Sequence, residues 1–274
     1  MSKESTVSVI MSCYNSEKTL EKAVDSILAQ TYTDWVMICC DDGSSDGTWD
    51  ILCSYREKYP DRFVLLRNEE NRRLPYSLNR CLEKAATELV ARMDADDWCL
   101  PERFEKQVRF LQTHPEYQLV GTGITVSDGE KKIASIIKYP EPTKQTMLRQ
   151  NAFSHATIMT YKWVYSALGG YSRAPYVERV EDVDLWCRFL AAGFRGFNLP
   201  DELYVMVENI GAVKRRTLQA RINSAKTRSR GYKLMGIRGI RRFTPYVNVL
   251  KAFVPTGAYQ IFHRWKLLRV RDRS

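Results

Sequence analysis

Residues 88–98 read ELVARMDADDW, and this stretch decides the fold. The apolar run Leu89-Val90-Ala91 is too short for a helix but has the length of a buried strand. It is followed directly by Asp94, Asp96 and Asp97. In open α/β sheets, ligands bind beyond the carboxyl ends of the strands. The stretch therefore predicts a buried strand over residues 88–93, followed in the sequence by a polar loop that faces a ligand.

The preceding sequence repeats this pattern of short apolar runs separated by helical spacing. The expected strands are 7–13 (VSVIMSC), 35–40 and 63–66, and the expected helices between them are 16–29, 46–59 and 75–86. Strands that alternate with helices indicate βαβ units and a parallel sheet covered on both faces. The predicted class is α/β, with a mostly parallel, Rossmann-like central sheet flanked by helices. Farther along, we expect strands at 117–126 and 131–139 and a helix at 181–192.

Charge is distributed unevenly along the chain. The net charge of the 274 residues is +10, but residues 214–274 carry +16 and residues 1–213 carry −6. We therefore predict a catalytic domain over 1–213 and a basic, helical C-terminal extension over 214–274. The extension interleaves bases with aliphatic and aromatic residues, as an interfacial surface on an anionic membrane does. The alternatives are helices that pack back on the domain with a solvated basic face, or a nucleic-acid-binding segment.

The seven cysteines are odd in number, form no CxxC pair and mostly lie in apolar segments. They predict reduced core residues of a cytosolic protein. The chain has no run of about 18 apolar residues, so the sequence predicts no membrane-spanning helix.

Three acids after one strand suggest a cation site. Asp94, Asp96 and Asp97 would repel one another unless a cation neutralised them, and carboxylate oxygens suit Mn²⁺ or Mg²⁺. The alternative is a solvated acidic turn that caps the next helix.

Two further polar segments follow the other expected strands. Tyr14 follows the first strand and can stack on a flat ring or simply pack. The sequence DDGSSDGT at 41–48 follows the second strand, and it leaves either Asp41 or Asp42 available to accept a hydrogen bond from a ligand. Turn formation alone would also explain this segment.

The opening of the helix at 181 supplies two more acids. Glu181 and Asp182 lie where a helix N-terminus favours carboxylates, so they are either helix-capping residues or a general base. His155 is one of only three histidines, and a single histidine is equally consistent with a structural role.

Taken together, these segments resemble the family 2 glycosyltransferases, which have the GT-A fold. The resemblance covers about residues 7–205 and rests on VSVIMSCYN, LAQTYTDW, ICCDDGSSDGT, ENRRLPYSLN, ELVARMDADDWCLPERFEKQVRFLQTHPE, and LGGY followed by VEDVDLWCRF. It is strongest to bacterial enzymes that build capsule, exopolysaccharide and O-antigen chains.

The resemblance implies a role for each matched residue. On the donor side, Tyr14 would stack on the nucleotide base, Asp42 would accept the imide N–H of uracil, and Asp94 would contact the ribose or the sugar. Asp96, with Asp94, would hold the metal. On the acceptor side, Asp182 would be the general base, with Glu181 and His155 beside it. Ser12 and Asn15 belong to the donor loop.

Two departures from the family pattern concern the donor side. The family usually has Pro at Ser12, which affects only the shape of the loop. It often has Gly in the stretch Asn71-Arg72-Arg73, where an arginine would either reach the donor diphosphate or face water, and we assign Arg72 to the donor site.

The implied activity is an inverting, metal-dependent, non-processive transfer of one sugar from a UDP-sugar, or from a dTDP-sugar. The expected acceptor is a saccharide on polyprenyl diphosphate. The enzyme would work in the cytoplasm, peripherally on the inner face of the membrane. One alternative is a nucleic-acid-binding protein, but the acidic body contains no recognised module of that kind, and we expect no nucleic-acid partner. The other is a nucleotidyltransferase of similar fold, which would release pyrophosphate.

Overall fold

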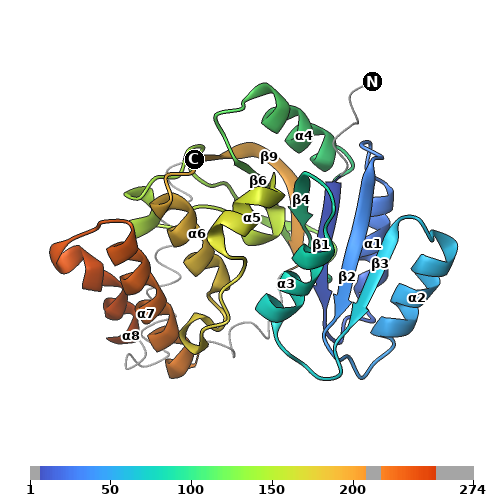
Figure 1. The fold of residues 1–274 in the computed structure, drawn as a ribbon, viewed down its shortest axis with the longest axis horizontal. Helices are drawn as coiled ribbons and strands as arrows, with labels where there is room; N and C mark the ends of the chain where they lie inside the picture. Colours follow the sequence, from blue (N-terminus) through green and yellow to red (C-terminus); the bar gives the residue numbers. More distant parts are fainter. Residues whose placement is uncertain (1–6, 208–216, 251–274) are drawn as a thin grey trace.

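The computed structural model describes residues 7–207 and 217–250, and its centre is a nine-stranded sheet (Figure 1). The order is β3-β2-β1-β4-β8-β6-β9-β5, with β7 paired to β6. The strands are β1 (Val7–Cys13), β2 (Trp35–Asp41), β3 (Phe63–Arg67), β4 (Leu89–Arg92), β5 (Trp98–Cys99), β6 (Leu119–Ser127), β7 (Lys132–Ile136), β8 (Met159–Tyr161) and β9 (Gly196–Val207).

The described helices cover both faces of this sheet. They are α1 (Leu20–Leu28), α2 (Thr48–Lys58), α3 (Leu74–Lys84), α4 (Arg103–Thr113), α5 (Lys162–Leu168), α6 (Glu181–Ala191), α7 (Leu218–Leu234) and α8 (Val247–Leu250). Short 3₁₀ turns include η1 (Thr146–Leu148), η2 (His155–Thr157), η3 (Pro175–Val177) and η5 (Gly239–Tyr246).

The first half of the sheet is the parallel part that the strand–helix alternation predicts. The pairs β1–β2, β1–β4 and β2–β3 are all parallel. In the second half, β8 runs antiparallel to both β4 and β6, whereas β6 and β9 are parallel. The α/β class is confirmed, with a mixed second half that the sequence pattern did not specify.

Two hydrophobic layers hold the sheet between its helices. In β1, Val9 and Met11 face the layer that contains side chains of α1, α2 and α4, whereas Ile10 faces the layer that contains side chains of α3, α5 and α6. This alternation follows from the two-residue period of a strand, and burial on both faces explains why β1 is apolar throughout. All seven cysteines are free thiols, and six of them are buried, as predicted.

Helix α7, the first described element of the basic extension, packs against α6 and η3 (Figure 1). Tyr232 and Met235 join the core, and the Thr217 side chain caps the helix by accepting the Ala220 N–H. The predicted boundary at residue 213 lies outside the described residues. Among the described helices, none is both long and apolar enough to cross a membrane.

Candidate active site

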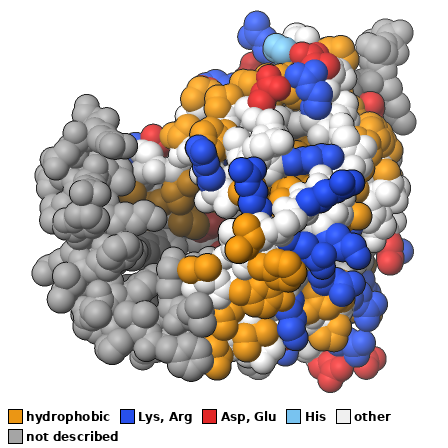
Figure 2. All heavy atoms as spheres, turned by 90° about the vertical axis from the view of Figure 1, so that its left-hand side faces the viewer, with side chains coloured by type: hydrophobic (Ala, Val, Ile, Leu, Met, Phe, Trp, Pro, Cys, Tyr) orange, Lys and Arg blue, Asp and Glu red, His pale blue; other side chains and the backbone are white. Residues whose placement is uncertain are grey.

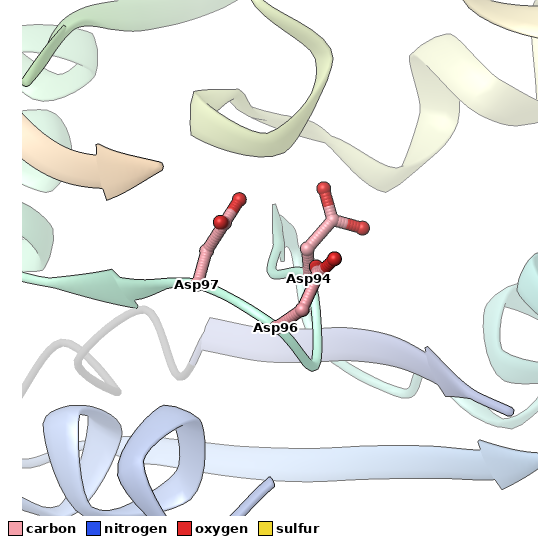
Figure 3. A group of neighbouring side chains, drawn as sticks. All are labelled: Asp94, Asp96 and Asp97. Atoms are coloured by element: carbon pink, nitrogen blue, oxygen red, sulfur yellow. The ribbon is translucent and has the colours of Figure 1, made fainter. Parts of the chain in front are cut away.

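The three aspartates gather on the loop after β4 (Figure 3). One ligand oxygen from each of Asp94, Asp96 and Asp97 can be chosen so that all three lie within 4.8 Å of one another. Parallel strands carry their connecting loops to the same edge, so this group lies beside the loops that follow β1 and β2. The sequence prediction that these acids converge is confirmed.

Asp97 is the buried member of this group. Its Oδ1 accepts the N–H of Val207 at 3.0 Å, and the hydroxyl of Tyr204 accepts the backbone N–H of Asp94 at 3.2 Å. Burial and the neighbouring charges of Asp94 and Asp96 raise the pKa of Asp97 to about 7. Crowded carboxyls of this kind are the electrostatic situation that a bound cation relieves.

The donor set fits a hard divalent cation. Mn²⁺ and Mg²⁺ take oxygen ligands at about 2.0–2.2 Å, and a cluster within 4.8 Å needs only small side-chain adjustments to reach such a geometry. Asp94 and Asp96 would hold the ion, as the sequence predicts, and Asp97 is a third candidate ligand.

Arg92, which sequence reasoning missed, lies directly under this group. It is the last residue of β4, its side chain is only 2% exposed, and its guanidinium forms an ion pair with Asp94. The signal was present in the sequence, because an arginine inside an apolar strand must find a charged or polar partner.

A cavity of about 760 Å³ opens beside the ends of β1 and β2. Ser12, Tyr14, Asp42 and Arg72 of the predicted donor site line it. Its volume is within the usual range of about 300–1,000 Å³ for ligand sites.

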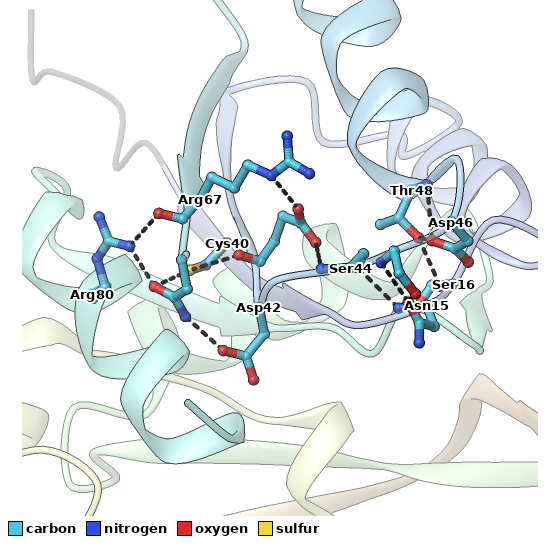
Figure 4. A network of polar contacts seen from close by, with 12 residues as sticks. Asn15, Ser16, Cys40, Asp42, Ser44, Asp46, Thr48, Arg67 and Arg80 are labelled. Carbon is cyan, nitrogen blue, oxygen red and sulfur yellow. Dashed lines mark hydrogen bonds and ion pairs between the residues drawn. The ribbon is translucent and has the colours of Figure 1, made fainter. Parts of the chain in front are cut away.

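Asp42 is the fixed polar group of this cavity. It is 2% exposed, and its Oδ1 accepts hydrogen bonds from Asn68 Nδ2, the Arg72 N–H and Ser77 Oγ at 2.6–2.9 Å. Figure 4 shows the bond from Asn68. Because these three bonds converge on one oxygen, the carboxylate is held in a single orientation. Such an acceptor can discriminate between ligands that do and do not offer a matching N–H.

The β1 loop is tied to the β2 loop by Asn15. Asn15 accepts the Ser45 N–H through Oδ1 at 2.9 Å and donates its own N–H to Ser44 Oγ at 2.9 Å (Figure 4). Asn15 therefore shapes the loop, whereas neighbouring Tyr14 is 49% exposed and free to stack on a flat ligand. Ser12 lies within β1 opposite Cys40 rather than in the loop, and it lines the cavity.

The two acids at the start of α6 have different surroundings. Glu181 lines the cavity, and burial raises its pKa to about 7. Asp182 Oδ2 accepts a hydrogen bond from Asn151 Nδ2 at 3.1 Å, and Asn151 in turn accepts one from Arg228 of α7 at 2.7 Å. Burial also raises the pKa of Asp182, against the charge of Arg228.

His155 has buried structural partners. Its Nε2 lies 2.8 Å from the Tyr171 hydroxyl, and its ring packs edge-on against Tyr171 and Trp186. Burial, aided by the charge of Arg92, lowers its pKa well below the usual value, so the ring is neutral at neutral pH. It is not among the described residues that line the cavity.

Arg73 follows Arg72 in the stretch where the sequence suggests that an arginine reaches the donor diphosphate or faces water. It lines the cavity with φ of 73° and ψ of 158°, a conformation that costs a non-glycine residue about 1–3 kcal/mol. Its guanidinium forms an ion pair with Glu178, and an exposed pair of this kind contributes only about 0–1 kcal/mol. The ion pair alone does not offset the backbone strain. The signal was the missing glycine in the stretch Asn71-Arg72-Arg73.

Comparisons with known proteins agree with this geometry. The chain is 39% identical over 276 residues to EpsE of Bacillus subtilis (strain 168), a protein named as a glycosyltransferase, with 97% of this chain and 96% of the relative covered. It is 26% identical over 234 residues to the Escherichia coli protein WfaP, named a UDP-Glc:alpha-D-GlcNAc-diphosphoundecaprenol beta-1,3-glucosyltransferase, covering 81% and 86%.

The fold is shared with TarS residues 1–349 of S. aureus, crystallised with UDP-GlcNAc. The TM-score is 0.71 at 17% identity, over 93% of this chain and 75% of that one. The sequence profile of Glycosyl transferase family 2 matches residues 8–166, more than half of the chain. With the relative at 39% identity, this match establishes that the chain belongs to glycosyl transferase family 2.

Proposed function

We propose that this glycosyltransferase moves one sugar from a UDP-sugar to a saccharide hydroxyl, with inversion, in the synthesis of a bacterial surface polysaccharide. The observation that carries the proposal is the meeting of three features at one sheet edge. These are the Asp42 cavity, the cluster around Asp96, and the acids that open α6.

The donor would occupy the cavity with its base beside Tyr14 and Asp42. Its diphosphate would then extend toward Asp94 and Asp96. A divalent cation held there supplies positive charge to the departing nucleoside diphosphate. TarS, which has the same fold, has been crystallised with UDP-GlcNAc, and this supports a uridine donor. Thymine offers the same imide N–H, so a dTDP-sugar is the second candidate.

The base at the start of α6 would receive the acceptor proton. We assign this role to Asp182, as the family resemblance implies, with its carboxylate oriented by Asn151. Attack of the acceptor oxygen on the anomeric carbon, from the face opposite to the departing UDP, inverts the configuration in one displacement. Glu181 is the second candidate, because it lines the donor cavity.

The acceptor would be carried on polyprenyl diphosphate at the membrane. WfaP, by its name, acts on a diphosphoundecaprenol-linked sugar, and this supports a lipid-linked acceptor. In the described part of the extension, Ile240 (84% exposed), Phe243 (55%) and Val247 (54%) are exposed beside the bases Arg238 and Arg241. Figure 2 views the molecule from this side and shows basic and hydrophobic side chains intermixed on it. We propose that this surface docks on an anionic bilayer.

Calorimetry with nucleoside diphosphates tests the donor assignment. We expect UDP to bind more tightly than GDP or CDP in the presence of Mn²⁺, because neither guanine nor cytosine offers the uracil arrangement to Asp42. Asp42→Asn should reduce the preference for UDP. Tighter binding of GDP by the wild-type protein contradicts the assignment.

A further inference from the structure

The strained Arg73 is ion-paired with Glu178 on the wall of the donor cavity. Arg73 belongs to the segment between β3 and α3, whereas Glu178 follows η3, and their ion pair joins residues 105 positions apart. Both residues line the cavity. The side chains are 64% and 39% exposed, so the pair is accessible to water and ions.

The backbone around Arg73 is fixed by contacts that do not involve its side chain. Its N–H donates to Asn71 Oδ1 at 3.2 Å, and its carbonyl accepts the N–H groups of Tyr76 and Ser77 at the start of α3. The preceding N–H, of Arg72, donates to Asp42 Oδ1. A glycine would make the same backbone contacts at positive φ without strain. The backbone contacts alone therefore do not require an arginine at this position.

Two other arginines of the cavity wall have an aromatic partner as well. Arg72 and Arg173 stack on the Tyr76 ring, at 5.1 and 4.8 Å from its centroid, and Arg72 is also ion-paired with Glu70. The described partner of the Arg73 guanidinium is a single, exposed carboxylate. A phosphate group binds arginine more strongly than such a carboxylate, because it presents more oxygens and more charge to the planar guanidinium.

We propose that Arg73 is a donor-binding residue that exchanges partners, releasing Glu178 to bind the donor diphosphate. The inference rests on the proposed nucleotide-sugar donor. In the free enzyme the ion pair lies on the cavity wall. When a donor enters, the phosphate takes the guanidinium and Glu178 turns toward water. Glu178 thus acts as a competitor that keeps Arg73 in place until the diphosphate arrives.

The test is calorimetry of UDP and of uridine, in Mn²⁺, on the wild type, Arg73→Gly, Glu178→Gln and the double variant. Arg73→Gly should weaken UDP binding by roughly 10-fold or more and leave uridine binding unchanged, because only UDP has phosphates. Its Tm should not fall, since glycine relieves the strain. Glu178→Gln should tighten UDP binding several-fold.

The double variant separates partner exchange from a general charge effect. If Glu178 acts through Arg73, Glu178→Gln should have little effect on UDP binding once Arg73 is glycine. The proposal is wrong if the wild type and Arg73→Gly bind UDP equally well, or if Glu178→Gln weakens UDP binding. It is also wrong if Glu178→Gln raises the UDP affinity by the same factor in the wild type and in Arg73→Gly. If the wild type binds GDP or CDP instead of UDP, the uridine assignment fails, and the same four proteins test the exchange with that nucleotide.

Discussion

The adjacent acids Glu181 and Asp182, at the start of α6, have different surroundings. Glu181 faces the cavity, whereas Asp182 is hydrogen-bonded to Asn151. Burial raises the pKa of both carboxyls, so each gains a proton at a higher pH than an exposed acid. A base must be unprotonated to accept a proton, and transfer should therefore slow as the pH falls.

We predict that Asp182→Asn lowers kcat by about 10²–10⁴-fold while the KM for the donor changes little, because the base faces the acceptor. Burial raises the pKa of Asp182, so the wild-type kcat should fall as the pH is lowered through this raised pKa, and this acid limb should persist in Glu181→Gln. The pH profiles of the wild type and both variants check this. If Asp182→Asn keeps the wild-type kcat while Glu181→Gln loses most of it, the general base is Glu181 and not Asp182.

Helix α7 belongs to the basic extension by charge but to the core by packing. Arg228 is linked to Asp182 through Asn151, and Gly231 lies against Cys187 of α6. The first described helix of the extension thus supports the candidate base. Charge counting could not predict this, because small residues such as Gly231 give no hydrophobic signal.

The close approach of α6 and α7 gives a stability prediction. A Cβ at Gly231 would lie 2.3 Å from the Cys187 Sγ, so Gly231→Ala should destabilise the protein by about 1–3 kcal/mol. The sign is diagnostic, because Gly→Ala inside a helix usually stabilises by about 0.5–1 kcal/mol. Urea unfolding measures the change. A gain in stability would contradict the described packing.

The exposed surface of η5 gives the second prediction at this scale. We expect the full chain to float with anionic liposomes and less so with neutral ones, and high salt should weaken the attachment. Ile240→Ser/Phe243→Ser should reduce flotation. Ile133→Ser is the matched control, because Ile133 is 51% exposed on β7, outside the extension. If the wild-type chain fails to float with anionic liposomes at low salt, the docking proposal fails and a purely packed extension is favoured.

For the whole molecule, the sequence predicted the parallel half of the sheet and the residues at its edge better than it predicted the rest. Strands such as β1 are apolar throughout because both faces are buried, which makes them easy to recognise. The antiparallel half includes β8, with only three residues, and its pairing with β4 is set by tertiary contacts rather than by a local pattern. The Arg73–Glu178 pair joins residues 105 positions apart, whose proximity only the folded chain reveals.

The most direct test of the central claim is release of the nucleoside diphosphate from a panel of UDP-, dTDP-, GDP- and CDP-sugars, with bacterial membranes as the acceptor source. We predict that a UDP-sugar releases UDP only when Mn²⁺ or Mg²⁺ and membranes are both present, and that Asp96→Ala abolishes this release. Release from a GDP- or CDP-sugar but from no UDP- or dTDP-sugar, or undiminished release of UDP in excess EDTA, would contradict the account.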